Sequence, residues 1–457
     1  MSSRRKFLGN AIGSVGALSL VNFNLLGDTT KIDEIFDNSK LKSDNSIYLR
    51  LVEESKKFLA LPDEEAAKDN DFWRLVKESY IINSKVLNLN NGGVCPQPKI
   101  VIDTLNNYNL LCNDIPTINM WRKLDKQREP LRNMLADLAG VSPKEIAINR
   151  NATEGLNSII FGLNLKEGDE VILTKQDYPN MIHAWRQREK RDKIKLIWLD
   201  LEMPSNDENY FVSQYVNAMT EKTKIVQINQ MINWNGQILP VQKIAREAHK
   251  RKIEVLVDAA HSFAQLDFKI PDLECDYFAT SLHKWMCAPF GTGMMYIKEN
   301  KIKNVWALLS ADDPDGVEIK KFEHLGTRSF AVEMATIEAI NFHNLITTKR
   351  KQQRLNYLSK YWTDKCLDIP KFKLNTVIDP KFSCGVVNFG YEDLDPTEVD
   401  KFLFDTCDIH AVTIKVENIK GVRITPNVYT LASDLDRLVD GLHKFDKKQI
   451  KKQSKKR

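Results

Sequence analysis

A regular alternation of strand-like and helix-like segments, beginning near residue 145, is the feature that most constrains the fold. Short apolar runs recur at 146–148, 170–173, 195–199, 224–228, 254–257, 277–279 and 293–297. Their length and composition are typical of strands buried on both faces. Helical segments such as 179–192 and 241–252 separate most of them. Because neighbouring parallel strands need a crossover connection, this rhythm predicts an α/β fold whose large domain has a mostly parallel sheet flanked by helices.

The remaining chain follows other patterns and completes a division into five segments. Residues 28–87 have apolar positions at helical spacing and indicate a polar helical extension ahead of the large domain at 88–330. A helical stretch from about 331 to 362, followed by short strands and helices, indicates a smaller C-terminal α+β domain at 331–446. Residues 447–457 carry seven basic side chains and no acids, and we expect a disordered tail there.

The first segment, residues 1–27, resembles an export signal of the twin-arginine type. Arg4 and Arg5 stand before Phe7-Leu8, and an uncharged stretch continues to Gly27. Its glycine and asparagine content argues against a stable membrane span. No A-x-A cleavage site follows, so a cleaved signal and an uncleaved anchor both stay open. We therefore expect a periplasmic or otherwise extracytoplasmic protein whose membrane contact is limited to this signal.

Composition excludes several classes of function. With 42% hydrophobic and 28% charged residues, the chain is an ordinary globular protein. The basic residues at the two ends of the chain contribute more positive charge than the formal net charge of +5. The rest of the chain is therefore mildly acidic, and no nucleic-acid surface is expected. The seven cysteines show neither C-x-x-C nor metal-ligand spacing, so neither a disulfide framework nor a metal site is expected.

Two short motifs at strand ends carry the chemistry. Asp258-Ala-Ala-His261 ends the run at 254–257, and Ser281-Leu-His-Lys284 follows the run at 277–279. Side chains at the carboxyl ends of parallel strands line one crevice, so the aspartate and the lysine are expected to meet there. This pair suits pyridoxal 5'-phosphate (PLP), which a lysine holds as a Schiff base while an aspartate faces the pyridinium nitrogen. Taken singly, such an aspartate can also cap a turn, and such a lysine can lie on the surface.

A phosphate site is expected in Asn149-Arg-Asn-Ala-Thr153-Glu-Gly155, between a strand and a helix that starts near Thr153. A helix N-terminus offers free backbone N–H groups and a partial positive charge, and Thr153 adds a hydroxyl donor. In isolation the same residues are as often a plain N-cap. Their position ahead of the aspartate and lysine motifs favours the phosphate.

Taken together, Asn-Ala-Thr-Glu, Asp-Ala-Ala-His, Ser-x-His-Lys and Gly-Val-Arg-Ile-Thr-Pro resemble the class V aminotransferase family of fold-type I PLP enzymes. The similarity is strongest to the isopenicillin N epimerase-like branch, beside the cysteine desulfurases. It covers about residues 88–445. The resemblance implies a homodimer that acts on a small amino-acid substrate.

The resemblance also implies a role for each matching residue. Lys284 would form the Schiff base and then act as acid and base, Asp258 would pair with the pyridinium N–H, and His261 would contact the phenolic oxygen. The other cofactor contacts that it implies are Ala152, Thr153, Ser281 and His283 at the phosphate, Tyr178 stacked on the ring, Asn233 near the cofactor oxygen, and Thr327 reaching the phosphate of the neighbouring subunit. The alternative for Tyr178 is that it does not contact the cofactor and is an ordinary core tyrosine after a strand.

On the substrate side, Arg423 is expected to bind the carboxylate, because a guanidinium fork matches a carboxylate bidentately and orients the Cα–H bond. Asn91 and Gly92 resemble the family segment that lines the substrate. One departure concerns the desulfurases, whose nucleophilic cysteine lies on a loop shortly before this arginine. Residues 409–420 contain no cysteine, and Cys407 precedes a strand, so thiolate attack lacks its usual nucleophile.

These motifs predict a PLP-dependent enzyme acting at the α-carbon of an amino acid, with transamination or epimerisation favoured. A C–S (cysteine) lyase or a desulfurase-like enzyme is the alternative within the family. A non-catalytic exported α/β binding protein is the alternative from another class. Retention of Lys284, Asp258 and Arg423 together argues against that last alternative.

Overall fold

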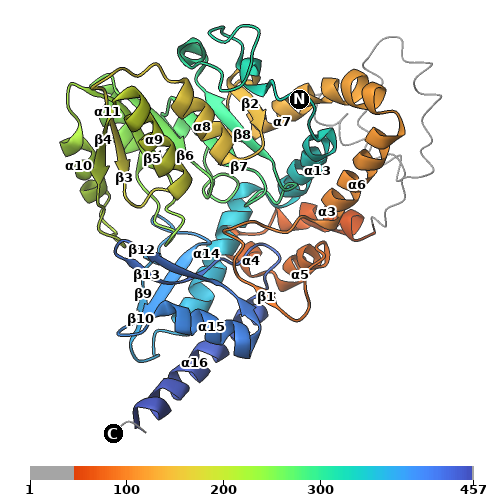
Figure 1. Ribbon diagram of the computed structural model, residues 1–457. Coiled ribbons are helices and arrows are strands. Elements are labelled where there is room, and N and C mark those ends of the chain that lie inside the picture. Colours follow the sequence, from red (N-terminus) through yellow and green to blue (C-terminus); the bar gives the residue numbers. More distant parts are fainter. Residues whose placement is uncertain (1–45, 455–457) are drawn as a thin grey trace. The chain divides into compact units, whose positions relative to one another are not determined.

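A seven-stranded sheet in the order β2-β8-β7-β6-β5-β3-β4 forms the centre of the larger part of the fold (Figure 1). The computed structural model describes residues 46–454, so the predicted export signal and the start of the predicted helical extension lie outside the described residues. The strands are β2 (Ile146–Asn149), β3 (Glu170–Thr174), β4 (Lys195–Leu199), β5 (Thr223–Asn229), β6 (Glu254–Asp258), β7 (Tyr277–Ser281) and β8 (Gly293–Ile297).

The sheet confirms the predicted α/β fold class. Strands β3 to β7 pair in parallel, and β8 is antiparallel to both of its neighbours, β2 and β7. Each of the seven apolar runs singled out in the sequence forms one of these strands. Because successive side chains of a strand point to opposite faces, the same strands feed two separate hydrophobic clusters, one on each side of the sheet.

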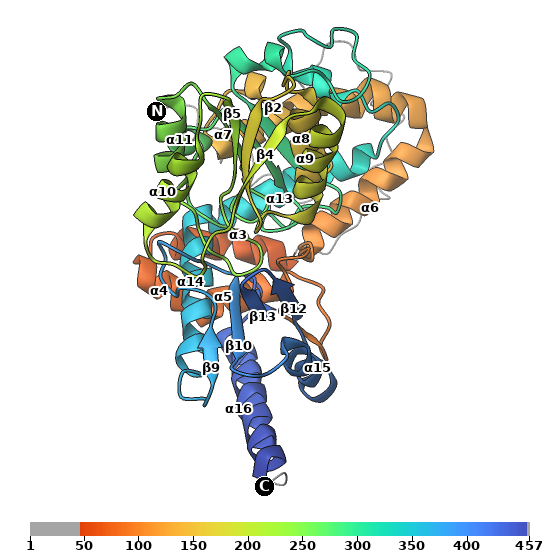
Figure 2. The same cartoon turned by 60° about the vertical axis from the view of Figure 1, so that its left-hand side comes forward.

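Helices cover both faces of this sheet (Figure 2). One face packs against apolar side chains of α7, α10, α11 and α13. The other face packs against α8 and α9, through side chains such as Leu156, Ile159 and Trp185. The helices of this part are α6 (Lys99–Asp114), α7 (Arg128–Ala139), α8 (Ala152–Gly162), α9 (Pro179–Asp192), α10 (Glu208–Ala218), α11 (Val241–His249), α12 (Ile270–Leu273) and α13 (Phe330–Ile346). Short helical turns are η3 (Ile118–Lys123), η4 (Leu124–Gln127), η5 (Pro143–Glu145), η6 (Glu299–Asn304) and η7 (Ile319–Glu323).

A second, antiparallel sheet in the order β12-β13-β10-β9 lies in the C-terminal part of the chain. Its strands are β9 (Phe372–Leu374), β10 (Val387–Tyr391), β12 (Val412–Val416) and β13 (Ile419–Ile424). Helices α14 (Thr348–Asp364), α15 (Pro396–Cys407) and α16 (Ala432–Ser454) share a hydrophobic cluster with this sheet. The small α+β arrangement expected from the sequence is therefore present.

The packing differs from the expected segment limits in three places. The helical stretch after 330 is two helices, which meet at Thr347 (φ 71°), and the first of them, α13, packs on the large sheet. Near residue 88, β1 (Leu87–Asn88) pairs with β11 (Ile409–His410) in a separate two-stranded sheet. This segment packs with the C-terminal part, because Leu89 is buried in the hydrophobic cluster of that part. Helix α16 continues to Ser454, into the segment expected to be disordered, since lysine and glutamine favour helix.

The described part of the predicted extension is helical and consists of α3 (Ser46–Phe58), α4 (Asp63–Lys68) and α5 (Asn70–Glu78). Phe58, Phe72 and Trp73 form its aromatic core. Arg354 of α14 fixes the extension to the C-terminal part by donating a hydrogen bond to the Ala67 carbonyl at 2.8 Å. Within residues 46–454, no helix combines the length and the apolar character needed to cross a membrane.

Candidate active site

A cavity of about 450 Å³ opens at the carboxyl ends of three adjacent strands of the large sheet. Asn229, Asp258 and Ser281 are the last residues of β5, β6 and β7, and all three line it. The hairpin β12–β13 of the small sheet closes the opposite side. The strand ends of an open α/β sheet are where ligands usually bind, and the volume is typical of small-molecule sites, which span roughly 300–1,000 Å³.

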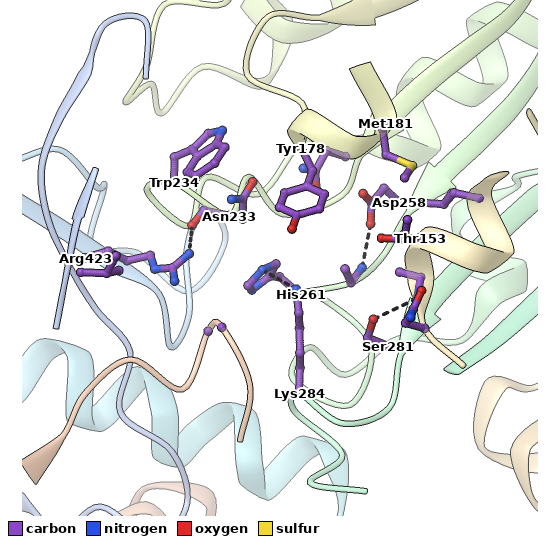
Figure 3. A pocket seen from close by; sticks show the side chains of 18 of the residues that line it. Thr153, Tyr178, Met181, Asn233, Trp234, Asp258, His261, Ser281, Lys284 and Arg423 are labelled. Atoms are coloured by element: carbon purple, nitrogen blue, oxygen red, sulfur yellow. Dashed lines mark hydrogen bonds between the residues drawn. The ribbon is translucent and has the colours of Figure 1, made fainter. Parts of the chain in front are cut away.

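Eleven of the thirteen site residues expected from the sequence line this cavity (Figure 3). They are Gly92, Ala152, Thr153, Tyr178, Asn233, Asp258, His261, Ser281, His283, Lys284 and Arg423. The other two, Asn91 and Thr327, lie elsewhere.

Lys284 projects into the cavity from the turn that follows β7. Its Nζ lies 3.1 Å from His261 Nε2. Burial lowers the pKa of Lys284 to about 8, against the opposing pull of the negative charge of Asp258. An amine with this pKa is partly neutral near pH 7, which is the form that attacks a carbonyl carbon.

Asp258 is the acid partner expected from the sequence. Its side chain is 4% exposed, and Oδ1 accepts a hydrogen bond from the Ala260 backbone N–H at 3.0 Å. Burial raises the pKa of Asp258, whereas the Ala260 N–H and the charge of Lys284 favour its ionised form. A buried carboxylate of this kind needs a positive or protonated partner in the cavity.

His261 and Asn233 present polar atoms that have no partner among the described residues. These atoms are Nδ1 of His261 and Oδ1 of Asn233, and both are buried. Burial lowers the pKa of His261 well below its usual value, so the ring is neutral. Because unpaired buried polar atoms cost free energy, their presence at the cavity wall indicates a polar ligand that pairs with them.

The N-terminus of α8 forms the other end of the cavity. The helix begins at Ala152, one residue before the expected start, and Asn151 rather than Thr153 caps it by accepting a hydrogen bond from the Glu154 N–H. The Ala152 N–H donates to Ser281 Oγ at 2.9 Å, which joins this helix end to the end of β7. Thr153 and His283 line the same region. A helix N-terminus with hydroxyl groups beside it is suited to a phosphate.

Arg423 extends from β13 across the cavity from Asp258. Nη1 donates to the Asn233 carbonyl at 2.8 Å, and Nη2 donates to Asn90 Oδ1 at 3.0 Å. Nε is buried without a partner, and no acidic side chain among the described residues forms an ion pair with this guanidinium. Burial lowers the pKa of Arg423 to about 10. A 6% exposed cation held only by neutral acceptors is a ready site for a carboxylate.

Gly92 leaves room for this guanidinium. A Cβ added at Gly92 would lie 3.4 Å from Arg423 Cζ and 3.0 Å from Thr425 Cγ2. Asn91, by contrast, turns away from the cavity and donates to the Thr425 carbonyl at 2.8 Å. Asn91 therefore fixes the position of this segment against the end of β13 and does not itself line the cavity.

Thr327 is exposed and lies outside the cavity of its own chain. Tyr178 is 40% exposed, and Figure 3 shows its ring over the cavity with the hydroxyl directed inward. The sequence reasoning missed several lining residues, among them Met181, Asn229, Trp234, Val412, Thr413 and Ile414. Trp234 directly follows the expected site residue Asn233 in the sequence. The β12 residues carried no signal, because nothing local shows which face of that strand meets the other sheet.

The cavity lacks, among its described lining residues, a cysteine that could take the place of the nucleophilic cysteine of the desulfurases. Residues 409–420 fold into β11, β12 and the turn to β13, and no cysteine is among the residues that line the cavity. Cys407 ends α15.

The class V aminotransferase model matches residues 87–430. The chain belongs to this family. The family depends on PLP, and PLP is accordingly the cofactor of this chain. The residues present fit it: an amine of lowered pKa, a buried carboxylate, unpaired atoms of His261 and Asn233, and a helix N-terminus beside Ser281.

Two curated relatives and one solved structure illustrate the similarity. The chain is 26% identical over 391 residues to an isopenicillin N epimerase of Streptomyces clavuligerus, covering 81% of this chain and 97% of the relative. It is 26% identical over 401 residues to a "probable cysteine desulfurase" of Halalkalibacterium halodurans, covering 81% and 95%. A mutant of the cystine C–S lyase C-DES, with glycine covalently linked to its PLP, matches with a TM-score of 0.71 and 20% identity, covering 79% and 96%.

The lowered pKa of Lys284 gives a direct test. A neutral amine-acetylating reagent, applied to cofactor-free protein and followed by peptide mass mapping, should modify Lys284 with a rate midpoint near pH 8. Only the neutral amine reacts, so the rate rises with pH through this pKa. In Asp258→Asn the midpoint should move to lower pH, because a negative charge that favours the ammonium form is lost. A midpoint near 10.5, the value of an ordinary lysine, would contradict the electrostatic description.

Proposed function

We propose that this PLP-dependent class V enzyme acts at the α-carbon of an amino acid, as an aminotransferase or an epimerase. The observation that carries the proposal is the buried guanidinium of Arg423, which has no acidic partner among the described residues and lies in the same cavity as Lys284. An amino acid whose carboxylate pairs with Arg423 supplies the missing counter-charge. Its amino group then points toward the reactive amine of Lys284.

Each residue has a task in this proposal. Bound PLP supplies the electron sink for the bond that breaks at Cα. Asp258 would face the ring nitrogen of PLP and keep it protonated, and the neutral imidazole of His261 would face the ring oxygen. Arg423 orients the substrate so that its Cα–H bond faces Lys284. Lys284 would remove a proton from Cα and return it, acting as a general base and then as a general acid.

The alternative is a C–S lyase or a desulfurase-like enzyme, and similarity to the "probable cysteine desulfurase" of Halalkalibacterium halodurans supports it. The lining of the cavity counts against the desulfurase form, since no thiol among the described lining residues could accept sulfur from a bound cysteine. A lyase needs no enzyme thiol and stays the stronger of the two alternatives.

The products formed alongside exchange of the α-proton separate these reactions. In D₂O, the amino acid recovered from the holoenzyme should carry deuterium at Cα, accompanied by inverted chirality (epimerase) or by formation of the 2-oxo acid, which has no α-hydrogen (aminotransferase). Lys284→Ala should abolish exchange, and Arg423→Ala should raise KM for the amino acid by about 100-fold or more, since a bidentate charged contact is lost. Arg423→Gln is the matched control, because it keeps a polar side chain but removes the positive charge. Sulfide release from cysteine without exchange on any other amino acid would favour the lyase instead.

We also propose a homodimer in which the Gly326–Arg328 loop completes the phosphate site of the neighbouring subunit. Arg328 anchors this loop by ion pairs with Glu333 and Asp125, which leaves Thr327 exposed and outside its own cavity. Light scattering should give about twice the monomer mass of 52.6 kDa. Thr327→Ala should weaken PLP binding, with Ser329→Ala as the exposed control. A monomer, or unchanged PLP affinity in Thr327→Ala, would contradict this arrangement.

Export through residues 1–27 is a further proposal, supported by Arg4-Arg5 ahead of Phe7-Leu8. The twin-arginine route carries folded proteins that already contain their cofactor, which suits a PLP enzyme. Arg4-Arg5→Lys-Lys should retain the protein in the cytoplasm, as judged by cell fractionation. An unchanged extracytoplasmic location in this variant would contradict the proposal.

A further inference from the structure

The face of the β12–β13 hairpin that meets the cavity is apolar around Arg423. In the antiparallel register, Val412 pairs with Arg423 and Ile414 pairs with Gly421. Directly paired residues share a face of the sheet, as do residues two apart on one strand. Val412 and Ile414 therefore lie on the same face as Arg423, and both line the cavity. Thr413 has its polar atoms engaged with Asp400, to which its hydroxyl donates at 2.8 Å.

Trp234 adds a second apolar surface near the guanidinium. Its Nε1 donates to the Gln176 carbonyl at 2.9 Å, which holds the indole ring in place. Figure 3 shows this ring beside Asn233, on the side of the cavity where Arg423 lies. Gly92 and Gly93 also line the cavity, and because they have no side chains they leave space beside the guanidinium of Arg423.

Each charged side chain that lines the cavity already has a role in the proposed function. Among the described residues that line it, the side chains that carry or can carry charge at neutral pH are Asp258, Lys284, Arg423 and the two histidines, His261 and His283. Burial lowers the pKa of both histidines, so they are neutral. Once Arg423 holds the α-carboxylate, the described residues that line the cavity offer no second cation or anion to the substrate side chain.

We propose that this wall, Val412, Ile414 and Trp234, is the subsite for the side chain of the substrate and selects amino acids with apolar side chains. This inference rests on the proposed function, because it takes Arg423 as the carboxylate clamp. An acidic or basic side chain placed there loses its hydration without gaining an ion pair, which disfavours binding. An apolar side chain is transferred from water to an apolar surface, which favours it.

Binding to the holoenzyme tests the inference. Absorbance changes of the bound PLP give dissociation constants for L-alanine, L-valine, L-phenylalanine, L-aspartate, L-glutamate and L-lysine. The three apolar amino acids should bind about ten-fold or more tightly than the three charged ones. If L-aspartate, L-glutamate or L-lysine binds as tightly as the apolar set, the inference is overturned while the proposed function stands. If no amino acid changes the spectrum, the proposed function itself fails.

A charge introduced on this wall sharpens the test. Val412→Arg should tighten L-glutamate binding by about ten-fold and weaken L-valine binding, because a cation then faces the side chain on the same face as Arg423. Val412→Gln is the matched control, which adds polarity without charge and should give no gain for L-glutamate. An unshifted PLP spectrum confirms that each variant is folded and loaded. A loaded Val412→Arg enzyme that shows no gain over Val412→Gln would overturn the inference, and Ile414→Arg repeats the test if the first variant does not load.

Discussion

The cavity buries two basic side chains against one carboxylate, and the rest of the site follows from this imbalance. Within the described residues, Arg423 has only neutral acceptors, and Asp258 supplies the negative charge that most favours the ammonium form of Lys284. A low-dielectric site cannot easily keep both cations charged without a counter-ion. Burial lowers the pKa of Lys284 to about 8, which suits it to act as a nucleophile, and lowers that of Arg423 to about 10, at which it stays protonated and suited to bind an anion. In the proposed function, catalysis and substrate binding therefore depend on the same electrostatic constraint.

This constraint is built from parts that lie far apart in the chain. The large sheet supplies Asp258 and Lys284 at the ends of two adjacent strands, and the small sheet supplies Arg423. Asn91 and Gly92 join the two parts, because they bond to Thr425 at the end of β13 while Gly92 lies against the guanidinium. The same hairpin that positions the clamp brings an apolar face into the cavity, so carboxylate binding and the proposed selection of the side chain share one element.

Much of this was predictable from local sequence. The apolar runs predicted the seven strands, and motifs at strand ends placed Asp258 and Lys284 together, because strand ends share one edge of a parallel sheet. What the sequence could not show depends on contacts between distant segments: the pairing of β1 with β11, the packing of α13 on the large sheet, and the cavity-facing side of β12. The position of Asn91 outside the cavity was hidden for the same reason, since its partner Thr425 lies more than 300 residues away.

The central claim is that Lys284 is the residue that binds PLP covalently. Purified holoprotein can be treated with sodium borohydride, which fixes a lysine–PLP bond, and then digested and mapped by mass spectrometry. The account predicts one modified peptide, which carries the reduced cofactor on Lys284. A cofactor found on another lysine, such as the buried Lys351, or no fixed cofactor in protein saturated with PLP, would contradict it.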